Sequence, residues 1–533
     1  MQSPNTSQVF VQNHPFEYDV IKGGTVFVDP EGDPLTYTVE MFNGPFGLRV
    51  SGTRIIGPGT EPGFVVINIS ASDGQNAPVR DGLQITITAN NPPTVVTPNP
   101  HLLVAAGSQV VHDATQAGAT FTDADGDPLS YQVSIRGTQH ALVASDSGVA
   151  GSMPGVGLAR VKITAFDGFG GVGENEFSIA VPAPEPGRPV LPESPYAYAD
   201  ADLPLPFRFR ETGPSPGHPQ LPDTMPPENP TTNAGATLGR VLFYDKRLSI
   251  TNTHSCGSCH EQARGFGSSD RFSVGALGVP LARHAMALAN SRYNLPNEYF
   301  SDMRVRTLEA LALMPIEEPL ELGNPLSMLE PKLREADFYP PLFEAAFGTP
   351  EISLDRVARA LAQFLRSMMS YRARFDLAFH PMDQDVPADP GAVLTAQELR
   401  GREVYIGGAC FHCHTLEVHA NPFPANNGLD DTITDPGTAA GRGEFRAASI
   451  RNIAVSGPYM HDGRFATLRE VIEHYDNGIQ LNPGLHIFFH SNMCCGPKRL
   501  NLTTEDKDAL EAFLNTFTDE EFLADPKFSD PFP

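Results

Sequence analysis

Two five-residue segments constrain the fold of this chain more than any other feature, because they share one pattern of cysteine and histidine. They are Cys256-Gly-Ser-Cys-His260 and Cys410-Phe-His-Cys-His414. Together they use four of the 6 cysteines in a chain of 533 residues, which leaves too few thiols for a disulfide scaffold or for a zinc site with four cysteine ligands. We therefore interpret both segments as attachment sites for a prosthetic group.

The spacing within each segment indicates which group is attached. In a Cys-x-x-Cys-His pattern, two thiols add to the two vinyl groups of a c-type haem, and the imidazole of the next residue ligates the iron. One such segment is consistent with chance or with part of a zinc site, whereas two in one chain favour haem. We predict two covalent haems, and the residues that hold them are Cys256, Cys259, His260, Cys410, Cys413 and His414.

A repeat organises the first half of the chain. Phe27-Val-Asp-Pro-Glu-Gly-Asp-Pro-Leu35 recurs as Phe121-Thr-Asp-Ala-Asp-Gly-Asp-Pro-Leu129, and Ala71-Ser-Asp-Gly74 recurs as Ala165-Phe-Asp-Gly168, both at an offset of 94 residues. Short β-branched segments of alternating polarity lie between these motifs and are bounded by turn residues. This pattern predicts two successive copies of one small immunoglobulin-like β-sandwich.

The repeated turn is similar to that of cadherin-like and dystroglycan-type immunoglobulin-like modules of bacterial surface proteins. It gathers carboxylates in each copy: Asp29, Glu31 and Asp33 in the first, and Asp123, Asp125 and Asp127 in the second. Hard oxygen ligands of this kind suit Ca²⁺, but Asp and Gly also favour the turn for conformational reasons alone. The sequence leaves both interpretations open.

The second half of the chain has a different character. A proline-rich stretch follows the repeats and is typical of a stiff, extended spacer. Beyond it, apolar residues three and four positions apart predict a helix over residues 354–375. Capping residues predict further helices that begin at Thr395, Thr467 and Thr503.

Ordered motifs in this half resemble the bacterial diheme cytochrome c peroxidases and their MauG-like relatives. They include Leu238-Gly-Arg-Val-Leu-Phe-Tyr-Asp245, Pro315-Ile-Glu-Glu-Pro-Leu-Glu-Leu-Gly323, Ser449-Ile-Arg-Asn452, Gly457-Pro-Tyr-Met-His-Asp-Gly-Arg-Phe465 and His474-Tyr-Asp-Asn-Gly478. The resemblance covers about residues 225 to 517. It implies two N-terminal all-β immunoglobulin-like sandwiches followed by a mostly α, two-lobed diheme cytochrome c domain.

We expect five segments along the chain. They are a first β-sandwich at 1–91, a second copy at 92–182, a proline-rich linker at 183–224, an N-terminal cytochrome c lobe with the peroxidatic haem at 225–390, and a C-terminal lobe with the electron-transfer haem at 391–533.

The resemblance assigns roles around both irons. Glu321 lies where the family has the glutamate that acts as acid and base during peroxide cleavage, and the alternative is an exposed glutamate at a helix end. Tyr475 lies where classical members have a methionine ligand to the second iron and MauG-like members a tyrosine. A core tyrosine is the alternative there, with Met460 or Met493 as the ligand instead.

The chain departs from the family pattern at several positions. Residues 273–282 contain no histidine that would cap the first iron, so we expect that haem to be open at rest. His284 replaces an asparagine that helps to bind Ca²⁺ between the lobes, and the remaining ligands would be the carbonyls of Ser456 and Pro458. Trp is absent, Ser301 stands where the family has an aromatic electron relay, and Tyr299 is the substitute.

These features predict an oxidoreductase that uses H₂O₂ and oxidises an electron-donor protein, another protein or an organic molecule. The alternative is an electron-transfer or surface-binding protein with both haems closed. The net charge of -26 argues against nucleic acid and favours a basic electron donor. We expect a periplasmic or extracellular protein without a membrane span, whose signal peptide is not in this sequence. The β modules would bind a surface partner, and the adjacent Cys494 and Cys495 would form a disulfide or crosslink.

Overall fold

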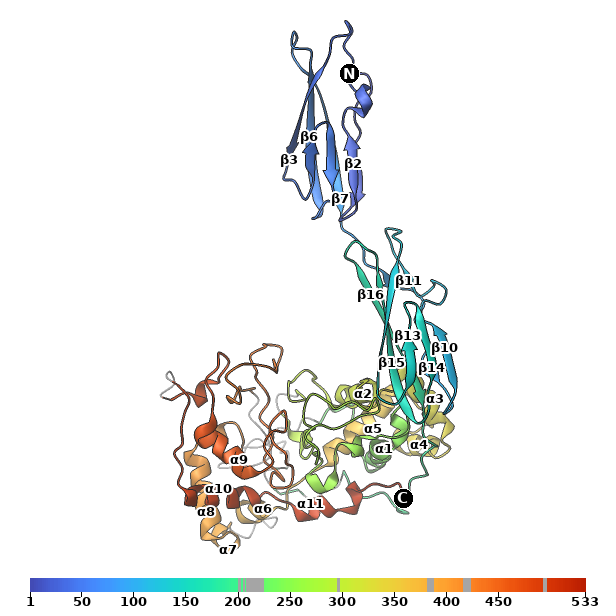
Figure 1. Ribbon diagram of the computed structural model, residues 1–533. Coiled ribbons are helices and arrows are strands. Elements are labelled where there is room, and N and C mark those ends of the chain that lie inside the picture. The colour runs from blue at the N-terminus through green and yellow to red at the C-terminus, as the bar shows by residue number, and fades with distance from the viewer. Residues whose placement is uncertain are drawn as a thin grey trace. The chain divides into compact units, whose positions relative to one another are not determined.

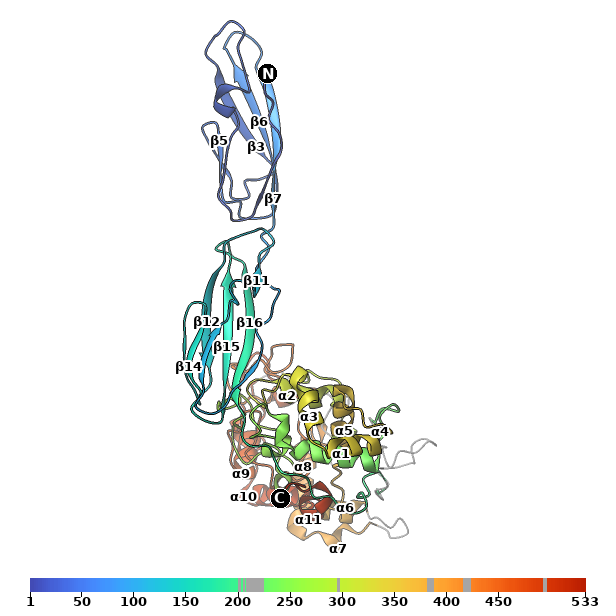
Figure 2. The ribbon, with the colours of Figure 1, turned by 90° about the vertical axis from the view of Figure 1, so that its right-hand side faces the viewer.

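The computed structural model describes residues 1–199, 203–204, 207, 225–294, 298–380, 388–415, 423–491 and 496–533. The chain divides into two compact units. The first contains most residues up to Ile179 and consists of β-strands, whereas the second contains Ala180–Pro533 and carries the α-helices (Figures 1 and 2). An all-β region followed by a mostly helical region is the predicted fold class.

The first module of the β unit is built from two sheets. One has the strand order β1 (Gln8–Val11), β7 (Val79–Thr88), β6 (Gly63–Ser72) and β3 (Thr36–Phe42), and the other has the order β2 (Phe16–Asp19), β5 (Arg54–Gly57) and β4 (Arg49–Ser51). β1 pairs with β7 in parallel, and the other pairs are antiparallel. Alternate residues of β6 and β7 are buried in the core, as the sequence pattern predicts.

The second module repeats this arrangement. Its largest sheet has the order β12 (Ser130–Arg136), β15 (Gly157–Phe166), β16 (Val172–Val181) and β9 (Leu102–Leu103). Two smaller sheets contain β10 (Gln109–Asp113), β14 (Gly148–Ser152) and β13 (Ala141–Ala144), and β11 (Phe121–Thr122) and β8 (Thr94–Val95). β12 and β15 begin 94 residues after β3 and β6, so the offset read from the sequence is confirmed in the strands.

The helical unit contains α1 (Asn233–Tyr244), α2 (Leu308–Glu317), α3 (Leu326–Glu335), α4 (Tyr339–Phe347), α5 (Leu354–Ser367), α6 (Arg374–Phe379), α7 (Pro390–Val393), α8 (Ala396–Gly407), α9 (Leu468–Glu473), α10 (Thr504–Asn515) and α11 (Glu520–Ala524). A π-helical turn, η8 (His474–Gly478), directly continues α9. The short 3₁₀ helices are η1 (Lys22–Gly24), η3 (Lys246–Leu248), η4 (Cys256–Ser258), η5 (Gln262–Arg264), η6 (Ser291–Tyr293), η7 (Cys410–His412), η9 (Ile487–Phe489) and η11 (Pro526–Phe528).

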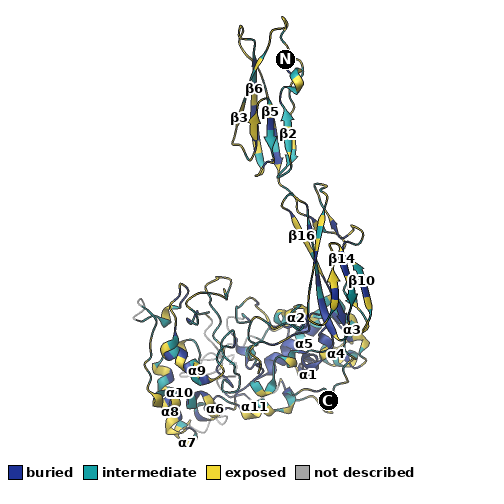
Figure 3. Ribbon diagram, viewed as in Figure 1, coloured by how far each residue is buried: buried dark blue, intermediate teal, exposed yellow. Residues whose placement is uncertain are grey.

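Two helix crossings have the same design. A Cβ atom on Gly239 of α1 would lie 2.0 Å from the carbonyl oxygen of Ala360 in α5, and one on Gly401 of α8 would lie 1.9 Å from that of Ala509 in α10. Only glycine allows backbones to approach this closely. Each crossing packs against its own hydrophobic core, and the buried faces of α1 and α5 are dark blue in Figure 3. The helical unit therefore has two lobes, each with one of the Cys-x-x-Cys-His segments.

The predicted helix starts agree with the structure better than the predicted helix end does. Thr395, Thr467 and Thr503 are the N-caps of α8, α9 and α10, and each accepts a hydrogen bond from a backbone N–H in the first turn. The helix predicted over 354–375 is wrong at its end, because α5 stops at Ser367 and α6 begins only at Arg374. Among the helices of the described residues, none is long and apolar enough to cross a membrane.

Candidate functional site: two cavities beside the cysteine pairs

The first Cys-x-x-Cys-His segment borders a cavity in the lobe of α1 and α5. The turn η4 brings Cys256, Cys259 and His260 to the wall of this cavity, among the apolar side chains Leu288, Leu311, Leu361 and Leu365. The Nδ1–H of His260 donates to the carbonyl oxygen of Phe266 at 2.8 Å, which leaves Nε2 as the metal-binding nitrogen. Burial lowers the pKa of His260, so the imidazole is in the neutral form that an iron ligand requires.

Glu321 lines the same cavity as His260. It lies in the loop after α2, where its N–H donates to the carbonyl of Glu318 and its own carbonyl accepts from the N–H of Ala276. Burial, and then the nearby charge of Glu318, raise the pKa of Glu321 to about 7. A carboxyl group with this pKa exchanges a proton readily near neutral pH.

His254 also lines this first cavity, and the sequence analysis did not single it out. One of its ring nitrogens lies 2.7 Å from the hydroxyl of Thr253, and burial lowers its pKa. Its position two residues before Cys256 is the one signal in the sequence that points to it.

The second segment borders a larger cavity of about 430 Å³. Cys410, Cys413 and His414 lie on its wall after α8 and η7. The Nδ1–H of His414 donates to the carbonyl of Ala448 at 2.7 Å, and burial lowers the pKa of the imidazole. Both predicted ligand histidines therefore have the same orientation, with Nδ1 held by a backbone carbonyl.

Tyr475 and Met460 both line this larger cavity. Tyr475 lies in the π-helical turn η8, and its hydroxyl accepts a hydrogen bond from Nδ2 of Asn427 at 3.2 Å. The same Nδ2 lies 3.5 Å from the sulfur of Met460. Burial raises the pKa of Tyr475 to about 12, and the bond from Asn427 opposes this shift. Met493, the other alternative, lies outside the described residues.

The residues of both cavities fit a haem. Arg446 lines the larger cavity and has a buried Nε without a hydrogen-bond partner, while one of its terminal nitrogens donates to the carbonyl of Glu298 at 3.1 Å. A buried guanidinium needs an anionic partner, and haem propionates are such anions. Two thiols, a neutral imidazole and an apolar wall complete the set of groups that hold a c-type haem.

Comparisons with known proteins agree with this geometry. A family model for "Di-haem cytochrome c peroxidase" matches residues 233–384. The chain is 32% identical over 304 residues to the methylamine utilization protein MauG of Methylorubrum extorquens, an alignment that covers 55% of this chain and 81% of that protein. It is 30% identical over 257 residues to the cytochrome c551 peroxidase of Nitrosomonas europaea, with 46% and 74% covered.

The chain belongs to the di-haem cytochrome c peroxidase family. Among solved structures, a MauG-like protein associated with microbial copper homeostasis shares 33% identity and a TM-score of 0.51, and the match covers 60% of this chain and 99% of that chain. Members of this family are oxidoreductases that carry haem c. The two cavities of this family member are therefore the candidate haem sites.

One segment of the chain separates the two candidate haem cavities. Leu288 lines the first cavity, whereas its neighbours Ala287 and Ala289 line the second. Ser301 lines the second cavity, but Tyr299 is absent from the walls of both among the described residues and instead packs in the core of the first lobe. Buried Tyr293, which the sequence analysis missed, lies on the wall of the second cavity.

Other predicted positions of the peroxidase family are placed as follows. His284, Ser456 and Pro458 all line the second cavity. Within the described part of the chain, these residues do not belong to any group of three or more acidic, histidine or cysteine side chains close enough to hold a metal ion. The Ca²⁺ site at Ser456 and Pro458 stays a prediction, and Cys494 and Cys495 lie outside the described residues.

Proposed function

We propose that this protein is a peroxidase that reduces H₂O₂ at the haem held by His260, with Glu321 as the acid and base and with a second haem held by His414 and Tyr475. One observation carries the proposal: Glu321 and His260 line one cavity, and the pKa of Glu321 is raised to about 7. Glu321 is half-buried among largely apolar side chains, and carboxyl groups whose pKa is shifted in this way cluster at functional sites.

The residues of the first cavity divide the chemistry between them. When bound, the haem supplies an iron that binds the peroxide and accepts its oxidising equivalents. His260 would hold this iron, and the bond from its Nδ1–H to the carbonyl of Phe266 fixes the orientation of the imidazole. Glu321 takes a proton from the inner oxygen of the peroxide and returns it to the outer oxygen, which then leaves as water.

The second cavity favours storage or relay of oxidising equivalents. A phenolate ligand from Tyr475 would stabilise an oxidised iron, which favours oxidation of a protein or organic substrate over simple peroxide removal. The net charge of -26 would attract a basic electron donor. We place the protein in the periplasm or outside the cell, because c-type haem is attached outside the cytoplasm, and we assign the β modules to docking on a surface partner.

The test is the rate of reaction with H₂O₂ in the Glu321→Gln variant. Glutamine keeps the size of the side chain but cannot exchange the proton, so the rate should fall roughly 10²–10⁴-fold. Glu317→Gln is the matched control, because Glu317 is an exposed residue at the end of α2, just before the loop that carries Glu321, and does not line the cavity. A wild-type rate in Glu321→Gln would contradict the role of Glu321. Two low-spin haems that ignore peroxide would favour electron transfer instead.

A further inference from the structure

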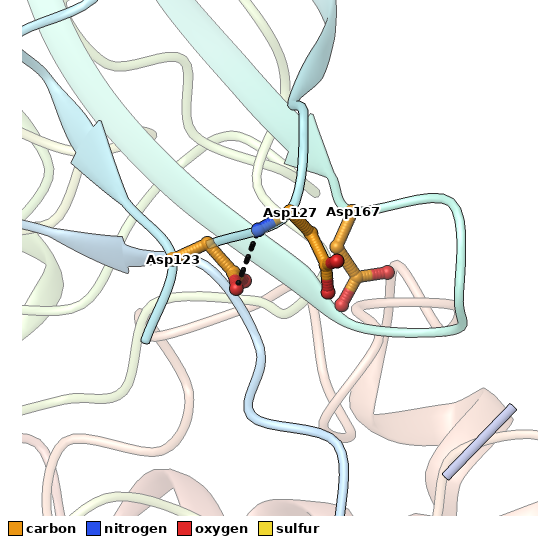
Figure 4. A group of neighbouring side chains, drawn as sticks. All are labelled: Asp123, Asp127 and Asp167. Atoms are coloured by element: carbon orange, nitrogen blue, oxygen red, sulfur yellow. Dashed lines mark hydrogen bonds between the residues drawn. The ribbon is translucent and has the colours of Figure 1, made fainter. Parts of the chain in front are cut away.

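Three carboxylates that are far apart in the sequence meet at one end of the second β module. Asp123 and Asp127 come from the turn between β11 and β12, and Asp167 follows β15 (Figure 4). One oxygen of each carboxylate lies within 4.8 Å of those of the other two. Asp167 belongs to the second repeated motif, Ala165-Phe-Asp-Gly168, which the sequence analysis did not connect with a metal.

Two oxygens of this cluster are buried without a hydrogen-bond donor. They are Oδ2 of Asp123 and Oδ2 of Asp127. The side chain of Asp127 is 8% exposed, and Asp167 is 1% exposed. Buried carboxylates are stable only when they are paired or bind a cation, and three of them at this distance repel one another. The cluster therefore needs compensating positive charge.

The remaining oxygens hold the carboxylates in place. Oδ1 of Asp123 accepts from the N–H of Asp125 at 2.8 Å, and Oδ1 of Asp167 accepts from the N–H groups of Phe169 and Gly171 at 2.7 and 2.9 Å. The Nδ2 of Asn90 donates to Oδ2 of Asp167 at 2.7 Å. The Oδ1 of the same Asn90 amide is buried without a partner, so a neutral oxygen lies beside Asp167.

His14 offers only part of the missing charge. Its Nε2 lies 2.7 Å from Oδ1 of Asp127. Even when protonated, this imidazole carries one positive charge against three carboxylates, and it leaves the unpartnered Oδ2 atoms of Asp123 and Asp127 without a donor.

The equivalent residues of the first module are arranged differently. Asp73, the counterpart of Asp167, accepts from the N–H groups of Gln75 and Asn76 and from Nδ2 of Asn76. Asp33, the counterpart of Asp127, is exposed and accepts from Nε2 of Gln75. Within the residues that the structure describes, the candidate metal group occurs in the second module alone.

We propose that the second β module binds one Ca²⁺ through Asp123, Asp127, Asp167 and the side-chain oxygen of Asn90. Several carboxylate oxygens and an amide oxygen form the hard, oxygen-only ligand set that Ca²⁺ prefers, and Ca²⁺ accepts the six to eight ligands that such a set and water would supply. The first copy of the repeat forms the same kind of turn but does not bind the ion. Of the two interpretations that the sequence allowed for the acidic turns, turn formation holds for the first module and cation binding for the second.

The experiment is hydrogen exchange of the full-length, haem-loaded protein with Ca²⁺ and with a chelator. The amides of Asp125, Phe169 and Gly171 donate to the proposed ligands, so Ca²⁺ should slow their exchange. At a free Ca²⁺ concentration ten times the Kd, the exchange should slow roughly tenfold, because the ion stabilises the closed state by a factor of 1 + [L]/Kd. The amides of Gln75 and Asn76 in the first module should not respond.

Variants link this response to the ligands. Asp127→Asn and Asp167→Asn should each abolish the slowing, whereas Asp33→Asn and Asp73→Asn, at the same positions of the first copy, should retain it. Asp123→Asn replaces a ligand that is less buried than Asp167 and serves if Asp167→Asn does not fold. Exchange that is unaffected by Ca²⁺ in the second module, or slowed equally in both modules, would overturn the proposal. Equal slowing by Mg²⁺ alone would overturn the assignment to Ca²⁺.

Discussion

The two candidate haem cavities carry the same five-residue pattern and differ in the other residues that line them. In each, a histidine donates its Nδ1–H to a backbone carbonyl, that of Phe266 in the first lobe and that of Ala448 in the second. The first cavity contains the carboxyl group of Glu321. The second contains a tyrosine and a methionine that share one asparagine.

This difference shows what an attachment motif determines and what it leaves open. Cys-x-x-Cys-His fixes one ligand and two covalent bonds, all from one turn of chain. The chemistry of the iron depends on the other side, which loops far away in the sequence supply. A carboxyl group suits proton transfer to peroxide, whereas a second ligand suits electron storage, so the two lobes can share a motif and divide a reaction.

We expect the largest effect from removal of the cysteines, which tests directly whether the two cavities have different roles in the reaction. In Cys256→Ala/Cys259→Ala, we expect one covalent haem and no reaction with H₂O₂, because the cavity with Glu321 has lost its iron. In Cys410→Ala/Cys413→Ala, we expect one covalent haem that still binds peroxide. Mass spectrometry counts the haems, and stopped-flow absorption follows the peroxide. Equal activity of the two variants would show that the lobes do not divide the reaction.

Substitution of the ligands in the second cavity should give the next largest effect. In Tyr475→Phe, we expect the low-spin electron paramagnetic resonance signal of the second haem to be lost or replaced, because phenylalanine cannot ligate iron. Met460→Leu is the matched control, because the sulfur of Met460 contacts the same Asn427 side chain. This variant should leave the signal unchanged. The signal of the first haem is an internal control. The reverse result, with Met460→Leu altering the signal, would make Met460 the ligand.

The fold followed from the sequence wherever local chemistry decides it. The 94-residue repeat predicted the paired sheets, and the capping threonines predicted three helix starts. The end of α5 could not be predicted in this way. The carboxylate of Asp519 accepts hydrogen bonds from the N–H groups of Tyr371 and Arg372 and from the hydroxyl of Ser370. This contact from almost 150 residues away holds the chain out of the helix, although its apolar periodicity continues.

The candidate site was predictable to a similar extent. The cysteines and histidines followed from one motif, and Glu321 and Tyr475 followed from a family resemblance. Asn427 and Arg446 come from long loops without a local signal, and only the folded chain brings them to the second cavity. Asp167 had a signal, since its motif repeats, but sequence alone does not show that the turn after β15 meets the turn before β12.

The bond from Asn427 to Tyr475 should have a smaller effect than either ligand. In Asn427→Leu, a phenolate ligand loses a hydrogen-bond donor and becomes a stronger electron donor to iron, so the reduction potential of the second haem should fall. A net hydrogen-bond energy of about 0.5–1.5 kcal/mol corresponds to roughly 20–60 mV for one electron. Spectroelectrochemical titration measures the shift. The control is to make the same Asn427→Leu change in the Tyr475→Phe variant. If the reduction potential shifts by the same amount in the wild-type protein and in Tyr475→Phe, Asn427 acts independently of Tyr475.

The smallest expected effect concerns the pH dependence of the first cavity. Glu321 must be deprotonated to accept the peroxide proton, so the rate of reaction with H₂O₂ should rise with pH around a midpoint near its pKa of about 7.

The charge of Glu318 is the second cause of that raised pKa. In Glu318→Gln, which keeps the oxygen that accepts from the N–H of Leu320, the pKa of Glu321 should fall, and the midpoint should move to lower pH. A like charge near the surface contributes about 0.2–1 kcal/mol, or roughly 0.2–0.7 pH unit. Glu321→Gln should abolish the midpoint altogether, and a midpoint that persists in that variant would assign the titration to another group of the cavity, with His254 the first to test.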